Sequence, residues 1–349
     1  MPQTKPPNID WINNLRLVAL YAVIILHVSS LLLMQHGKVP MSDWMVADFF
    51  NAIVRFAVPA FVMVSGALLL NREYEIGDFL KKRLVRVVIP FIFWSLVYVG
   101  YSWYNEDITF TDDAWWNITM VLHLLKTGSA YHLWYVYMLI GLYFFIPVIG
   151  KFVRNASEKE ILYFLAVWFA VMLITQPYLL RYNPSVDMHY FAGFAGYLVL
   201  GHYLAYKEFN IKHLQLWMIL LFVASVILIA LGSRMLAGGK QWPGTMFYEP
   251  VSPLVMLLSG SAFMAFRLSK TKLSLLIMRI RDFVGNFNYG IYLAHALILF
   301  LLDDRYGISY KFCTPIVSIP LTALICLLIT LALVWLVNKI PVVGKWISG

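Results

Sequence analysis

The chain has 349 residues, of which 61% are hydrophobic and only 13% are charged. Because a soluble globular domain usually carries about a quarter charged residues, this composition excludes a water-soluble domain. The net charge is +9, but the basic residues cluster in short segments between apolar blocks. That arrangement is typical of membrane topology signals rather than of a surface that binds nucleic acid.

The apolar residues gather in long blocks, and runs of about 20 such residues are typical of bilayer-spanning helices. We therefore predict an all-α, polytopic integral membrane protein with about ten transmembrane helices and a single transmembrane domain over residues 1–349. The predicted spans are approximately 14–35, 46–70, 86–105, 131–152, 160–180, 189–207, 214–233, 250–267, 283–303 and 314–338.

The connections between the blocks predict the orientation. If the N-terminus lies in the cytoplasm, most of the 27 Lys and Arg residues fall on the cytoplasmic side, as the positive-inside rule requires. Both termini are then cytoplasmic. The segment 106–130 contains Trp115 and Trp116 and predicts a short amphipathic helix on the outer surface, with both indoles at headgroup level.

The first block places Arg16 and His27 eleven residues apart, which puts both side chains on one helical face about 16 Å apart along the axis. With Arg16 at the cytoplasmic boundary, His27 lies near the bilayer centre, where desolvation favours a neutral imidazole. A neutral, buried histidine can act as a general base. The alternative is a packing histidine that bonds to a neighbouring helix.

The second block contains Arg55, about one or two turns inside the outer boundary. This arginine either lines a functional path or snorkels to the surface. Pro59, Ser65 and Gly66 follow it, and they predict a kinked helix in close contact with a neighbour.

Lys82, Arg83 and Arg86 lie at the cytoplasmic start of the third block. Lys82 and Arg86 share a helical face because they are four residues apart. Such a cluster can hold phosphate groups through charge-assisted hydrogen bonds. Basic clusters at this position are also common topology signals and bind anionic lipids.

Polar and aromatic side chains also occur in the fourth and ninth blocks. His132 and Trp134 lie near the predicted outer boundary, where aromatic belts are common. Asn288, Tyr292 and His295 have i, i+4, i+7 spacing and share one face of the expected ninth helix. His295 would lie about 18 Å from the cytoplasmic end of this helix, at a depth close to that of His27. Two histidines at similar depth are compatible with a shared interior cavity.

Sequence signatures for metal or ATP chemistry are missing from the chain. It has no HExxH, no metal-spaced Cys/His set, no GxxxxGK[ST] and no GxSxG. We therefore expect no metal cofactor.

Five ordered segments resemble a known family: WINNLRLVALYAVIILH, RFAVPAFVMVSGALLL, KKRLVRVVIP, YHLWYVYMLIGLYFFIPVI and YGIYLAH, between about residues 10 and 298. Together they resemble the membrane-bound acyltransferase-3 family, and most closely the branch that contains the enterobacterial common antigen O-acetyltransferase. The family usually has an acidic residue three positions before the arginine, where this chain has Asn13.

The resemblance implies a ten-helix bundle in a bacterial cytoplasmic (inner) membrane. It would move an acyl group, acetyl in the first instance, from cytoplasmic acyl-CoA to a cell-envelope glycan or lipid-linked saccharide, in contact with membrane lipids and without nucleic acid. The roles that it implies are catalytic for His27, Arg16 and Asn13, cofactor-binding for Lys82, Arg83, Arg86 and Arg55, and substrate-binding for His132, Trp134, Tyr292 and His295.

Two alternatives to this mechanism stay open. One is a covalent acyl-histidine intermediate in place of direct transfer. The other is a membrane transporter or exporter of a glycan or a small metabolite, since ionisable residues within the membrane also mark transport pathways.

Overall fold

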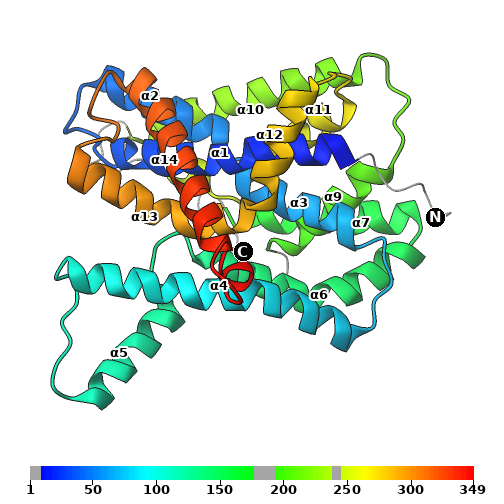
Figure 1. Cartoon of the computed structure of the whole chain (residues 1–349). Helices are drawn as coiled ribbons and strands as arrows, with labels where there is room; N and C mark the ends of the chain where they lie inside the picture. Colours follow the sequence, from blue (N-terminus) through cyan, green and yellow to red (C-terminus); the bar gives the residue numbers. More distant parts are fainter. Residues whose placement is uncertain (1–8, 177–192, 238–244) are drawn as a thin grey trace. The chain divides into compact units, whose positions relative to one another are not determined.

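The computed structural model describes residues 9–176, 193–237 and 245–349, and every regular element in these ranges is a helix (Figure 1). The predicted all-α class is therefore confirmed. In chain order the helices are α1 (Ile9–Leu33), α2 (Met41–Val54), α3 (Ala57–Leu69), α4 (Ile76–Tyr104), α5 (Ala114–Thr127), α6 (Trp134–Asn155), α7 (Glu158–Ile174), α9 (Ala195–Tyr206), α10 (Leu214–Ala237), η2 (Thr245–Tyr248), α11 (Pro253–Leu268), α12 (Leu275–Asn286), α13 (Asn288–Tyr306), α14 (Pro315–Asn338) and α15 (Gly344–Ile347).

Several helices have the length and apolar character of membrane spans. Within the described ranges seven segments qualify, and the bent pair α12–α13 makes eight if it counts as one span. The predicted spans 160–180 and 189–207 correspond to α7 and α9, which have 17 and 12 residues and adjoin residues 177–192, outside the described part. The chain is therefore a multi-pass membrane protein, and the total of ten spans and the cytoplasmic termini stay predictions.

The second span is interrupted at Arg55 and Phe56, between α2 and α3. Pro59 has no N–H to donate to the carbonyl of Arg55, and its ring would clash with that carbonyl in a continuous helix. The helix is thus interrupted four residues before the proline, but Arg55 and Phe56 keep right-handed helical angles, so the predicted kink stays a prediction.

The continuous ninth span predicted at 283–303 is wrong. The chain leaves helical geometry at Phe287 (φ −109°, ψ 11°), and α12 and α13 meet there at 75°. His295 is therefore only seven residues from the start of α13, about 10 Å along its axis, rather than about 18 Å along one straight helix. The Asn-Phe-Asn run at 286–288 explains the break, because asparagine side chains favour turns over helix interiors.

The third span begins ten residues earlier than the predicted position 86. The Glu75 side chain caps α4 by accepting hydrogen bonds from the backbone N–H groups of Asp78 (2.6 Å) and Gly77 (3.2 Å). These bonds hold the pKa of the Glu75 carboxyl below its usual value. The basic cluster that begins at Lys82 therefore lies within a formed helix, about two turns from its start.

The helices form two compact units whose segments alternate along the chain. The first unit comprises the described parts of Met1–Glu73, Phe145–Gly285 and Ile308–Leu324. The second comprises Tyr74–Phe144, Asn286–Gly307 and Ile325–Gly349. The single transmembrane domain expected over residues 1–349 stays a prediction.

In the first unit, α3 and α9 cross without room for side chains at two glycines. A Cβ on Gly66 would lie 2.0 Å from the carbonyl oxygen of Leu198, and one on Gly201 would lie 2.1 Å from that of Met63. Small residues allow this backbone approach, which maximises van der Waals contact between helices in a membrane. The close contact predicted at Gly66 is thus confirmed.

In the second unit, α4, α13 and the C-terminal residues are joined by hydrogen bonds to backbone carbonyls. The Trp94 indole donates to the carbonyl of Ile347 (3.0 Å), and the Tyr289 hydroxyl donates to that of Val87 (2.9 Å). Gly290 allows the C-terminal backbone to approach, since a Cβ there would lie 1.8 Å from the carbonyl oxygen of Ser348. These contacts fix α13 against α4.

The connection between α4 and α6 contains a helix with no buried residue, α5. Asp113 caps it by accepting from the N–H groups of Trp115 (2.8 Å) and Trp116 (3.2 Å), and both of these indoles are exposed. Figure 1 shows α5 projecting away from α4. The short helix predicted in segment 106–130 is confirmed, and its location at the outer membrane surface stays a prediction.

Candidate functional site

The first turns of α1 are anchored to α12 by a buried arginine, Arg281, whose side chain is 4% exposed. Its guanidinium donates to Asp10 Oδ1 (3.1 Å), to Asn14 Oδ1 (2.8 Å) and to Asp282 Oδ1 (2.8 Å). The Asn13 side chain also bonds to Asp282. Asn13 therefore lies against a carboxylate that α12 provides.

We expect Arg281→Met to destabilise the protein by about 1.5–3 kcal/mol, because it removes hydrogen bonds from a charged donor while it keeps an apolar stem. Thermal unfolding of purified protein in detergent measures this effect. Arg279→Met is the matched control, since Arg279 is exposed on the same helix. Equal melting temperatures for the two variants would show that the contacts of Arg281 do not hold α1 to α12.

Arg16 and His27 both lie on α1 as predicted, and both are half-buried. Next to His27, the carbonyl of Leu26 accepts hydrogen bonds from Ser30 Oγ (2.7 Å) and Ser29 Oγ (3.1 Å). Asn51 of α2 donates through Nδ2 to Ser29 Oγ (3.0 Å) and to Ser30 Oγ (2.9 Å). The backbone beside His27 is thus tied to α2 by a polar network.

Arg55 extends this network at the break between α2 and α3. Its Nη2 donates to Asn51 Oδ1, and its guanidinium lies over the ring of Tyr248, 4.7 Å from the centroid. The Tyr248 hydroxyl donates to Asp48, a carboxylate with only 4% exposure. Arg55 is therefore held by interior partners, which argues against simple snorkelling. Sequence patterns missed Asp48 and Tyr248 because they are 200 residues apart.

In the second unit, the predicted basic cluster lies on the first turns of α4. Lys82 and Arg86 are exposed, and Arg83 is half-buried over the ring of Phe79, 5.9 Å from the centroid. In the described ranges none of the three has an acidic partner within ion-pair distance. Their charge is available for an anionic ligand.

The second unit also brings together three predicted substrate-binding residues. The rings of His132 and His295 are 4.9 Å apart, and the Tyr292 ring lies 5.5 Å from His132. The Tyr292 hydroxyl donates to the carbonyl of His132. These three side chains are buried. Trp134 does not join them, since its side chain is 43% exposed.

Backbone carbonyls determine the tautomers of the two histidines. His295 Nδ1 lies 2.6 Å from the carbonyl oxygen of Tyr292, and His132 Nε2 lies 3.2 Å from that of Leu293. A carbonyl only accepts, so each of these ring nitrogens must carry the proton. In the neutral rings, the lone pair is then on Nε2 of His295 and on Nδ1 of His132. Each lone pair can accept a proton or a hydroxyl hydrogen bond.

Tyr98 of α4 was not predicted, and it organises this histidine cluster. Its hydroxyl donates to the carbonyl of Leu293 (2.9 Å) and accepts from the N–H of Leu297 (3.0 Å). A hydroxyl group thereby takes the place of one i→i+4 hydrogen bond in α13. No spacing rule connects positions 98 and 293, so the sequence held no signal for this contact.

The predicted residues therefore form two groups, one in each unit. Asn13, Arg16, His27 and Arg55 belong to the first unit, and the other predicted site residues belong to the second.

Comparison with known proteins identifies the family. The sequence model of the acyltransferase-3 family, described as an acyltransferase domain, matches residues 9–339. The chain is also similar to the "Putative membrane-bound acyltransferase YfiQ" of Bacillus subtilis (strain 168), with 24% identity over 311 residues that cover 82% of this chain and 80% of the relative. No solved structure matches significantly. Since the family match covers nearly the whole chain, the protein belongs to the acyltransferase-3 family and is a membrane acyltransferase.

Proposed function

We propose that the protein is an acyl-CoA-dependent O-acyltransferase of the bacterial inner membrane. It moves an acyl group, in the first instance acetyl, from cytoplasmic acetyl-CoA to a hydroxyl of an extracytoplasmic or lipid-linked cell-envelope glycan. The proposal also places the protein in the branch of the family that contains the enterobacterial common antigen O-acetyltransferase. The observation that carries it is the family match over residues 9–339, which includes a half-buried His27 inside the long apolar helix α1.

The proposed chemistry is direct transfer with His27 as general base. The neutral imidazole takes the proton of the acceptor hydroxyl while the oxygen attacks the thioester carbonyl. The tetrahedral intermediate collapses by breaking the carbon–sulfur bond, and the imidazolium returns the proton to the thiolate of CoA. Arg16 would stabilise negative charge near the donor on the same helical face, and Asn13 would hold the start of α1 through its bond to Asp282.

The network beside His27 supports this role. Catalytic groups need a fixed orientation, and the bonds from Ser29, Ser30 and Asn51 to one another and to Leu26 hold the backbone of α1 at this point. Arg55 continues the network to Asp48 and Tyr248. We assign Arg55 to the path of the transferred group, where its positive charge would favour the oxyanion of the intermediate.

The acceptor side is assigned to the second unit. The lone pairs on His132 and His295 and the aromatic faces beside them suit a sugar, which presents hydroxyl donors and apolar ring faces. Tyr292 packs within this cluster, and exposed Trp134 would contact the glycan at its outer edge.

Lys82, Arg83 and Arg86 are assigned to the phosphates of the donor, and Arg86→Ala tests this assignment. Loss of a charge-assisted hydrogen bond should weaken acetyl-CoA binding about tenfold. Isothermal titration with purified protein measures the affinity. Lys81→Ala is the control, because Lys81 is exposed on the same helix about 140° around the axis from Arg86. Equal affinities for both variants would remove the α4 cluster from the donor site.

A turnover assay separates the enzyme from a transporter. Purified protein given acetyl-CoA and envelope glycan should release free CoA and add one acetyl mass to the glycan. Release of CoA without acetylated glycan would refute the acceptor class, and no glycan-dependent release with any acyl-CoA would refute the transferase mechanism.

A further inference from the structure

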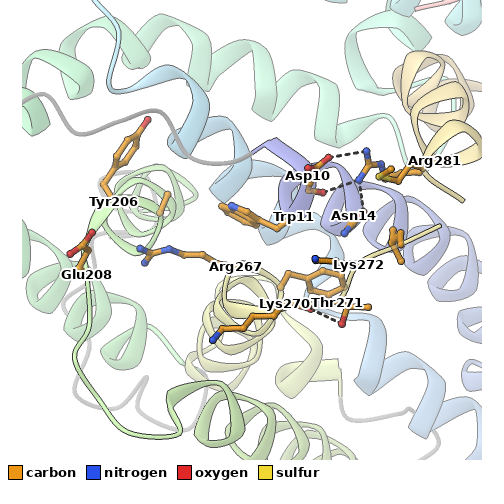
Figure 2. Close-up of a pocket in the computed structure, with 15 residues that line it drawn as sticks. Asp10, Trp11, Asn14, Tyr206, Glu208, Arg267, Lys270, Thr271, Lys272 and Arg281 are labelled. Atoms are coloured by element: carbon orange, nitrogen blue, oxygen red, sulfur yellow. Dashed lines mark hydrogen bonds and ion pairs between the residues drawn. The ribbon is translucent and has the colours of Figure 1, made fainter. Parts of the chain in front are cut away.

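A cavity of about 750 Å³ opens in the first unit (Figure 2). Asp10, Asn14 and Arg281 form part of its wall, and none of the residues proposed for acyl transfer does. Its wall is built from the start of α1, the end of α9, the end of α11, the loop that follows it, and α12. This volume is typical of pockets that bind small molecules. All the contributing segments fall on the cytoplasmic side in the orientation that the sequence predicts.

The wall of this cavity is positively charged. Among the described residues that line it, the basic ones are Arg267, Lys270, Lys272 and Arg281 and the acidic ones are Asp10 and Glu208, which leaves an excess of two positive charges. Both acids have a basic neighbour. Asp10 pairs with Arg281 at 3.1 Å, and Glu208 lies within electrostatic reach of Arg267.

The excess charge comes from two lysines on the loop between α11 and α12. Lys270 and Lys272 are exposed, and in the ranges 9–176, 193–237 and 245–349 neither has a carboxylate within ion-pair distance. Figure 2 shows both lysines among the residues that line the cavity. An anion bound in the cavity would therefore balance two positive charges that no carboxylate within ion-pair distance offsets.

The remainder of the wall is held in place. Arg267 donates through Nη1 to the carbonyls of Leu204 and Lys207, the latter at 2.7 Å, so its guanidinium closes the end of α9. Thr271 N donates to Ser269 Oγ (3.3 Å), which orders the lysine loop. Trp11 packs edge-on against Phe263, with 4.9 Å between ring centroids, and gives the cavity a flat apolar wall. A pre-formed site loses little entropy when a ligand binds.

We propose that this cavity binds the phosphate groups of a small ligand through Lys270 and Lys272. Phosphate oxygens are the acceptors that best match guanidinium and ammonium donors, and Trp11 suits an apolar group attached to the phosphate. The phosphate can belong to a soluble nucleotide or to a lipid headgroup, and the test below distinguishes the two. This site does not depend on the proposed acyl transfer, because only binding is claimed.

The first arm of the test measures nucleotide binding. All proteins in this arm carry Arg86→Ala, which weakens the donor site proposed on α4, so that the cavity is tested separately. Each full chain is placed in nanodiscs of zwitterionic phosphatidylcholine and titrated with adenosine 3′,5′-bisphosphate. The double variant Lys270→Gln/Lys272→Gln should bind at least about tenfold more weakly than the protein with Arg86→Ala alone. Lys270→Arg/Lys272→Arg should keep most of the affinity, since it keeps the charge. The control double variant Lys151→Gln/Lys212→Gln removes two exposed lysines of the same unit from outside the cavity and should bind normally.

The second arm measures lipid binding. Native mass spectrometry of protein in detergent with added phosphatidylglycerol should show a bound lipid that the Lys270→Gln/Lys272→Gln variant loses and the control double variant keeps, if the headgroup is the natural source. If the Lys270→Gln/Lys272→Gln variant loses binding in either arm, the phosphate site is supported, and the arm in which binding is lost shows whether the phosphate belongs to a nucleotide or to a lipid. If the cavity variant and the control variant bind alike in both arms, the proposal is wrong, whether or not the protein transfers acyl groups.

Discussion

His27→Ala should lower the rate of CoA release by about 100- to 10,000-fold, because general base catalysis contributes that factor to proton transfer. The substitution removes the only proposed acceptor for the hydroxyl proton, while the α4 cluster that would bind the donor is untouched. Acetyl-CoA affinity should therefore stay unchanged while turnover is lost. Both are measured on the same purified protein, by titration and by thiol detection.

The control for this experiment is His123→Ala. His123 is exposed on α5, outside both groups of predicted site residues. It should turn over normally. Normal turnover by His27→Ala would show that the base lies elsewhere, and His295, whose Nε2 carries the lone pair, would be the next residue to test. An acylated His27 detected by mass spectrometry would instead favour a covalent intermediate.

Gly201→Ala should destabilise the protein by about 1–3 kcal/mol, as is usual when extra atoms are forced into a packed interior. The added methyl would lie 2.1 Å from the carbonyl oxygen of Met63 and 2.4 Å from its Cα, so α3 and α9 would have to separate. Backbone atoms cannot rotate away as a flexible side chain can. A melting temperature lowered by several degrees in a detergent thermal-shift assay is the expected result.

Gly100→Ala makes the same chemical change in α4, where nothing lies within 4 Å of the added methyl. It should be neutral or slightly stabilising, because alanine favours a helix over glycine by about 0.5–1 kcal/mol. If Gly201→Ala were as stable as Gly100→Ala, the tight crossing of α3 and α9 would not contribute to stability.

The local patterns in the sequence predicted much of the architecture. The long apolar blocks predicted a multi-pass, all-α protein. Pro59 predicted an interruption before α3, and Gly66 predicted a close contact between two helices. Each of these signals acts within a few residues of its own position. Predicted boundaries failed where polar residues continue a helix, as at Lys82, because a cap such as Glu75 can start a helix well before its apolar part.

The site was only partly predictable for a different reason. Helical periodicity identified His27 and His295 as polar residues at depth, but it cannot show what surrounds them. Asp10 and Arg281 pair across 271 positions, and no period links such distant segments. The bend at Phe287 also shows how a depth estimate fails when one assumed helix is two.

The Tyr98 hydroxyl sits inside the hydrogen-bond ladder of α13, between the N–H of Leu297 and the carbonyl of Leu293. Because this one hydroxyl bonds to both backbone groups, α13 cannot slide by one turn along α4 or rotate about its own axis without leaving both groups without a hydrogen bond. We therefore expect α4 and α13 to move together as one rigid body. Shape changes during a catalytic cycle must then occur outside the α4–α13 pair.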